Sequence, residues 1–235
     1  MTLRHATAAC TAAVLLAACG GGGDGGGTDD NSGYLPLATG NRWVYDDGSE
    51  SRVTGQRDAG GQRWWVLQDT QNGLTDEALL RKDAQGIYSR FEDPQIGTLT
   101  YTLIKLPVAA GTSYPAASYR LTAFFDYDGN GTADDVDLAS EATVVGIESV
   151  VTPAGTFGNA LHMRLSGTST VVYRPSGTRA LLSTTVGDDW FADGIGPVKG
   201  TSSDTLAATG EVTTSSYALT GYQVGTRTGG TLPPR

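Results

Sequence analysis

Apolar and polar residues alternate over short segments along most of the chain, and this pattern predicts β-strands. Successive side chains of a strand point to opposite faces, so an alternating segment has one face to bury and one to expose. β-Branched and aromatic residues, which favour strands, are concentrated in the same places. The segments are 42–45, 63–67, 86–91, 98–106, 120–125, 141–151, 160–165, 168–174, 179–186 and 212–224.

Turn-forming residues such as Gly60-Gly61 and Asn72-Gly73 separate these segments. Only residues 76–84 also fit a short helix, although a strand fits there as well. About ten strands joined by tight turns predict an all-β, mainly antiparallel domain over residues 34–235. We expect a curved half-barrel, a barrel-like sheet or a sandwich, with little helix.

The first 18 residues differ from the rest and have the layout of a secretory signal peptide. Arg4 precedes a short apolar segment, 6–17, which is too short to span a membrane. The segment ends in Leu16-Ala17-Ala18-Cys19, which resembles the bacterial lipobox of an aliphatic residue, two small residues and a cysteine. The resemblance implies that residues 1–18 are removed and that Cys19 carries the acyl chains of a lipoprotein.

Residues 19–33 are predicted to form the lipidated cysteine and a flexible tether. Residues 20–27 are glycine except for Asp24, and residues 28–33 add no apolar side chain. Such a stretch cannot bury enough apolar surface to fold. In related lipoproteins of Gram-negative bacteria, Asp directly after the cysteine favours the inner membrane. Gly20 stands there in this chain, so the resemblance implies the outer membrane.

Charge and cysteine content narrow the function further. The 16 Lys and Arg residues against 25 Asp and Glu residues give a net charge of −9. A nucleic-acid-binding protein needs a basic face, so this class is excluded. An acidic body gains nothing from anionic lipids, so membrane attachment would rest on the acyl chains. Cys10 leaves with the signal peptide and Cys19 is acylated, so the mature domain would have no disulfide.

Four phrases of the mature domain resemble small bacterial β-rich lipoproteins of uncharacterised function. They are YLPLATGNRWVY (34–45), LPVAAGTSY (106–114), TPAGTFGNAL (152–161) and WFADGIGPVKG (190–200). The fold of that family is thought to resemble the half-barrel of the lipoprotein-localisation carriers. The resemblance therefore implies a concave face able to hold an acyl chain or a protein partner, and it transfers no catalytic residues.

Residues 126–137 fit a calcium-binding loop. Ca²⁺ takes six to eight oxygen ligands, which such loops supply from positions 1, 3, 5, 7, 9 and 12, with Gly at position 6. These ligands would be Asp126, Asp128, Asn130, the Thr132 carbonyl, Asp134 and Asp137, with Gly131 at the turn. Position 12 is Asp rather than the Glu of an EF-hand, so the loop resembles the dockerin or FG-GAP type. Asp135 is an alternative to Asp137 for closing the loop.

A solvated turn is the alternative interpretation of this loop, because Asp, Asn and Gly favour turns in any case. However, five carboxylates within twelve residues repel one another unless a cation offsets their charge. We therefore predict one structural Ca²⁺, bound with a dissociation constant on the order of 10⁻⁴–10⁻³ M.

The remaining sequence contains few candidate catalytic residues. His162 is the only histidine after the signal peptide, and alternation places it with Arg164 on a surface face. Asp188 and Asp189 are interpreted as polar turn residues that enter a strand. As adjacent strand residues they would point to opposite faces, so they cannot form one catalytic site. No Gly-x-Ser-x-Gly motif accompanies His162.

The adjacent residues Trp64 and Trp65 form the possible ligand surface. They lie in one predicted strand, so one of the two rings must face outward or into a concavity.

The sequence thus predicts a non-enzymatic, lipid-anchored periplasmic protein of the outer membrane, with one structural calcium. It would bind an apolar ligand or a protein partner. A purely structural or adhesive surface lipoprotein is the alternative, and a hydrolase is a third interpretation. An open apolar cavity would favour ligand binding, whereas a filled core would favour the structural role.

Overall fold

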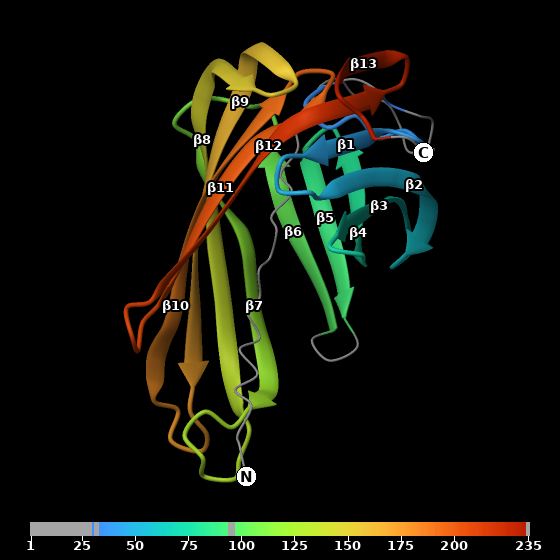
Figure 1. Ribbon diagram of the computed structural model, residues 1–235. Helices are drawn as coiled ribbons and strands as arrows, with labels where there is room; N and C mark the ends of the chain where they lie inside the picture. Colours follow the sequence, from blue (N-terminus) through green and yellow to red (C-terminus); the bar gives the residue numbers. More distant parts are fainter. Residues whose placement is uncertain (1–29, 31–32, 94–96, 234–235) are drawn as a thin grey trace.

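The computed structural model describes residues 30, 33–93 and 97–233 and contains thirteen β-strands in that part of the chain (Figure 1). The predicted signal peptide, Cys19 and most of the predicted tether lie outside these residues. The strands are β1 (Arg42–Tyr45), β2 (Glu50–Ala59), β3 (Gln62–Gln71), β4 (Leu74–Asp83), β5 (Gly86–Asp93), β6 (Gly97–Lys105), β7 (Ser113–Phe125), β8 (Asp134–Thr152), β9 (Gly155–Val172), β10 (Arg179–Ala192), β11 (Gly196–Leu206), β12 (Val212–Val224) and β13 (Arg227–Gly230). The described residues contain no helix that could cross a membrane.

All the strands belong to one antiparallel sheet that forms a nearly closed barrel. The strand order is β6-β5-β4-β3-β2-β1-β12-β11-β10-β9-β8-β7, and β13 adds to β12. The two end strands, β6 and β7, meet through tyrosine side chains. The Tyr114 hydroxyl donates to the Leu103 carbonyl at 2.7 Å, and the Tyr119 hydroxyl bonds both the N–H and the carbonyl of Thr100. Side chains therefore close the barrel at this seam.

The barrel has two unequal halves. Strands β1–β6 contain 4 to 10 residues each, whereas β8 and β9 contain 19 and 18. The long strands β7–β10 extend well past the shorter half in Figure 1. Strand β1 has four residues and pairs with β2 on one side and β12 on the other, so it joins the two halves.

Side chains fill the interior where the halves face each other. The largest fully buried residues include Trp43 from β1, Ile104 from β6, Leu161 and Met163 from β9, and Phe191 from β10. The Trp43 indole N–H donates to the Ile195 carbonyl at 2.6 Å, which satisfies its polar atom inside the core. Smaller apolar clusters form around Trp64 and around Leu121.

The prediction of an all-β antiparallel barrel is confirmed, with thirteen strands in place of about ten. Residues 76–84, which also fitted a helix, lie mostly in β4. The predicted strands 160–165 and 168–174 belong to one continuous strand, β9. Strands β2 and β11 escaped prediction because both are largely polar: apart from a few buried positions at one end, neither buries an apolar face.

Candidate functional site

Three acidic side chains meet in the loop between β7 and β8. Asp126, Asp128 and Asp134 each place a carboxylate oxygen within 4.8 Å of the other two. Asp134 is the first residue of β8 and is 0% exposed, whereas Asp128 is exposed. These three carboxylates, which we call the acidic triad, could hold a metal ion.

The loop backbone wraps around the triad. The Asp126 carboxylate accepts hydrogen bonds from the N–H groups of Gly129 at 2.8 Å, Asn130 at 3.2 Å and Gly131 at 2.8 Å. Gly129 and Gly131 have φ angles of 74° and 85°, a left-handed conformation that glycine adopts without strain. A carboxylate has about four acceptor positions, so these bonds leave room for a cation. The donor set of hard oxygens suits Ca²⁺.

Hydrogen bonds also connect the loop to the turn between β9 and β10. The Arg174 N–H donates to Asp134 Oδ1 at 2.7 Å, and the Asn130 side-chain amide donates to the Arg174 carbonyl at 2.8 Å. Two hairpins that are distant in sequence thus share one network at the end of the long strands. An ion bound to the triad would therefore stabilise both hairpins.

The structure does not bring Asp137 or Asp135 to the triad. Strand β8 begins at Asp134, so alternation places the next two odd-numbered acids on the opposite face. Asp137 pairs with Arg120 and Arg179, each at 2.6 Å, and the hydrogen bond from Arg120 contributes most to lowering its pKa to about 2. The carboxylate of Asp135 accepts from the Ala123 N–H at 2.9 Å, which mainly lowers its pKa.

The possible ligand surface at Trp64 and Trp65 is largely covered. Trp64 is 3% exposed, packs with Leu79 and lies under the Arg81 guanidinium, which is 5.5 Å from the ring centroid. Trp65 faces the main core and is half-buried. Only Trp65 retains some exposed surface.

His162 belongs to a polar cluster on the outer face of the sheet. Alternation correctly placed it with Arg164, opposite the buried Met163, but His162 itself is only 9% exposed. Its Nε2 lies 2.7 Å from Asp188 Oδ1, and its ring stacks on Trp190 with centroids 4.3 Å apart. Local sequence could not predict this burial because the covering residue comes from the neighbouring strand.

Asp188 and Asp189 point to opposite faces, as predicted. The Asp188 carboxylate accepts from Arg164 at 2.9 and 3.1 Å on the outer face. Asp189 lies inside the barrel and is 5% exposed.

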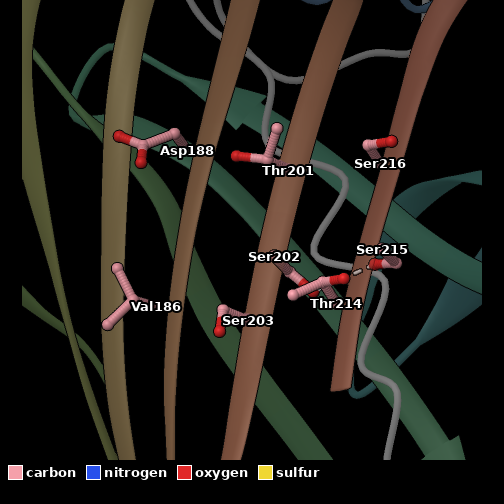
Figure 2. Close-up of a pocket in the computed structure, with 8 residues that line it drawn as sticks. All are labelled: Val186, Asp188, Thr201, Ser202, Ser203, Thr214, Ser215 and Ser216. Atoms are coloured by element: carbon pink, nitrogen blue, oxygen red, sulfur yellow. Dashed lines mark hydrogen bonds between the residues drawn. The ribbon is translucent and has the colours of Figure 1, made fainter. Parts of the chain in front are cut away.

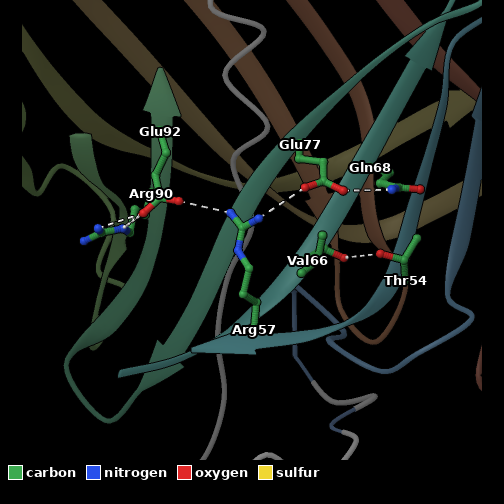
Figure 3. Close-up of polar contacts among 7 residues, drawn as sticks. All are labelled: Thr54, Arg57, Val66, Gln68, Glu77, Arg90 and Glu92. Atoms are coloured by element: carbon green, nitrogen blue, oxygen red, sulfur yellow. Dashed lines mark hydrogen bonds and ion pairs between the residues drawn. The ribbon is translucent and has the colours of Figure 1, made fainter. Parts of the chain in front are cut away.

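Among the depressions on the outer surface of the described chain, two are lined mostly by polar residues, although carbon atoms form most of the lining surface of the first. The first has a volume of about 450 Å³ and spans β10, β11 and β12 (Figure 2). Its lining residues are Val186, Asp188, Thr201, Ser202, Ser203, Thr214, Ser215 and Ser216. The second, of about 340 Å³, surrounds Arg57, which pairs with Glu77 at 3.5 Å and Glu92 at 3.1 Å (Figure 3).

No protein-family model matches the sequence, and no curated protein matches it. Two solved crystal structures resemble the fold. A predicted lipoprotein from Parabacteroides distasonis has 13% sequence identity and a TM-score of 0.46, with 82% of this chain and 99% of that chain covered. A predicted exported protein with a YmcC-like fold from Bacteroides fragilis has 16% identity and a TM-score of 0.36, with the same coverage.

Proposed function

We propose that the chain is a non-enzymatic, lipid-anchored protein of the bacterial cell envelope whose barrel is stabilised by one calcium ion. The lipobox-like sequence Leu16-Ala17-Ala18-Cys19 supports acylation of Cys19, and Gly20 directly after it supports the outer membrane. The body would then act as a docking domain for a protein partner.

The observation that carries the calcium proposal is the acidic triad and its bonds to the neighbouring turn. Asp126, Asp128 and Asp134 meet within 4.8 Å, and Arg174 bonds Asp134 from the β9–β10 turn. Bringing three carboxylates together is unfavourable unless a cation offsets their repulsion. Calcium would therefore fasten the β7–β8 loop to the adjacent hairpin, and this role is structural.

A protein partner fits the described interior and surface better than an apolar ligand. Side chains such as Trp43, Met163 and Phe191 already occupy the barrel interior, so an acyl chain would have to displace them. Six of the eight residues that line the depression across β10–β12 are Ser or Thr. Their hydroxyl groups can bond a polar surface, although carbon atoms form most of the lining. A purely structural or adhesive role remains the alternative, since a filled core also suits it.

Native mass spectrometry of the purified chain, with and without EDTA, tests both parts of the proposal. We expect one calcium adduct that EDTA removes, that Asp126→Asn abolishes and that Asp193→Asn keeps. Asp193 is a suitable control because it is an exposed acid in a different turn. A metal-free mass in millimolar calcium would contradict the calcium site. A non-covalent lipid retained by the folded chain would favour the apolar-ligand alternative over partner docking.

A further inference from the structure

Five polar side chains meet inside the barrel where its two halves join. Tyr45 of β1, Ser51 of β2 and Asp69 of β3 come from the shorter half, and Asp189 of β10 and Tyr217 of β12 come from the longer half. We call this group the interior acidic cluster. None of its members belongs to the acidic triad, and none was singled out as functional by the sequence.

The cluster is closely packed. The Tyr217 hydroxyl donates to Asp189 Oδ1 at 2.8 Å, and the Tyr45 and Tyr217 rings meet edge to face with centroids 4.8 Å apart. On the other side, the Ser51 hydroxyl donates to the Asp69 carboxylate. Tyr45 is 4% exposed, and its hydroxyl lies near the Ser51 side chain. The contact between Tyr45 and Tyr217 therefore connects two buried carboxyl groups from opposite halves.

All the charged groups that act on the cluster are acids. The negative charge of Asp188 raises the pKa of Asp189, and that of Asp76 raises the pKa of Asp69. The charge of Asp47 raises the pKa of Tyr45 in the same way. Within the described chain, no lysine, arginine or histidine offsets them. A buried carboxylate without a cationic partner is unfavourable, so each carboxyl group tends to keep its proton.

The direction of titration follows from this environment. Burial raises the pKa of Asp189 to about 8 and the pKa of Asp69 to about 6. Burial also raises the pKa of both tyrosines above their usual value of 10.0. Near neutral pH, Asp189 is therefore mostly protonated, whereas Asp69 is mostly ionised, so only one of the two buried carboxyl groups carries a charge.

The cluster lies where few backbone hydrogen bonds join the two halves of the barrel. Strand β1 has only four residues, and its ladder to β12 is interrupted by a register shift between Val44 and Tyr45. On the far side of the barrel, the halves meet through the hydroxyl groups of Tyr114 and Tyr119. Few backbone hydrogen bonds thus oppose a separation of the halves when charge develops between them.

We propose that the interior acidic cluster is a pH-sensitive contact, which holds the two halves of the barrel together while Asp189 is protonated and loosens when Asp189 ionises. An unfolded aspartic acid loses its proton near pH 4. Between about pH 4 and pH 8 the folded chain binds the extra proton, so the stability of the fold decreases as pH rises through this window. Below this window both states are protonated, and above it the loss is complete.

Carboxyl NMR titration and thermal unfolding of the purified chain test this proposal. We expect the Asp189 carboxyl to titrate near pH 8 and the melting temperature to fall by roughly 10 °C between pH 5 and pH 9. In Asp189→Asn, at least half of that fall should disappear. Asp204→Asn is the matched control, because Asp204 of β11 bonds Thr185 away from the joint, and it should keep the parent profile.

Amide hydrogen exchange of the unmodified chain tests the proposal even if Asp189→Asn does not fold. After correction for the intrinsic rate, the amides of β1 and the paired part of β12 should exchange at least tenfold faster at pH 9 than at pH 5. A titration of Asp189 below pH 5, or equal protection of β1 at both pH values, would overturn the proposal.

Discussion

Gly200 in β11 is required by the two side chains that lie over it. A β-carbon added there would overlap the Tyr217 ring and the Asp189 carboxylate, both of which belong to the interior acidic cluster. Gly200→Ala should therefore displace Tyr217, break its 2.8 Å bond to Asp189 and lower the free energy of unfolding by about 2 kcal/mol, as overpacking commonly does. Denaturant unfolding measures this loss.

Gly146→Ala is the control for this substitution. Gly146 also lies in a strand, β8, but an added β-carbon meets nothing within 4 Å. The unfolding free energy should change little. Equal effects at the two glycines would mean that strand propensity, rather than the contact with Tyr217, determines the result.

At the scale of single residues, the sequence predicted the face of the sheet on which a side chain lies better than the residues that the side chain contacts. Alternation correctly separated Asp188 from Asp189, because adjacent strand residues must point to opposite faces. The same rule explains why Asp137 leaves the predicted calcium loop once β8 begins at Asp134. The partners Arg120 and Arg179 could not be predicted, since they lie in β7 and β10, and the sequence does not reveal the order or register of these strands relative to β8.

At the scale of elements, the β7–β8 loop and the β9–β10 turn should be stabilised together by calcium. With free calcium at ten times the dissociation constant, binding would raise the free energy of unfolding by roughly 1.4 kcal/mol. Thermal unfolding should therefore shift upward by roughly 3–6 °C, and EDTA should reverse the shift. Hydrogen exchange should slow in residues 126–134 and also around Arg174, because Arg174 bonds Asp134.

Asn130→Ala tests the connection between these two elements. The substitution removes the bond from the Asn130 side chain to the Arg174 carbonyl. Because Asn130 is also one of the predicted ligands, the comparison is made at a calcium concentration that saturates the variant. Calcium should then protect the loop more than the turn. Protection confined to the loop in the parent chain would contradict a fastening role.

The boundaries of strands could be predicted where one face is buried in apolar surroundings. Strands β1 and β12 were predicted with their observed bounds. In β1, Trp43 and Tyr45 are buried, so the alternation is visible in the sequence. Most of β2 and β11 is polar and solvent-accessible, and pairing with their neighbours rather than burial holds them in place. Strands held by backbone hydrogen bonds in this way cannot be recognised from the pattern of apolar residues.

At the scale of the whole molecule, closure of the barrel depends on the seam between β6 and β7. The Tyr114 hydroxyl bonds Leu103 and the Tyr119 hydroxyl bonds Thr100, so two phenol groups replace a backbone ladder. The double variant Tyr114→Phe with Tyr119→Phe keeps both rings and removes both hydroxyl groups. The two hydroxyl groups make three hydrogen bonds, one to Leu103 and two to Thr100. Since a hydrogen bond contributes about 1 kcal/mol and the two at the exposed Thr100 contribute less, we expect a loss of about 2 kcal/mol.

The local effect of opening the seam should be larger than this global loss. The amides of β6 should exchange faster in the double variant, because β6 is an end strand paired only with β5 in the sheet order. Tyr173→Phe, outside the seam, should leave the exchange of β6 unchanged. If β6 keeps its protection in the double variant, packing of the Tyr101 and Tyr119 rings, whose centroids lie 5.9 Å apart, holds the barrel closed instead of the hydroxyl groups.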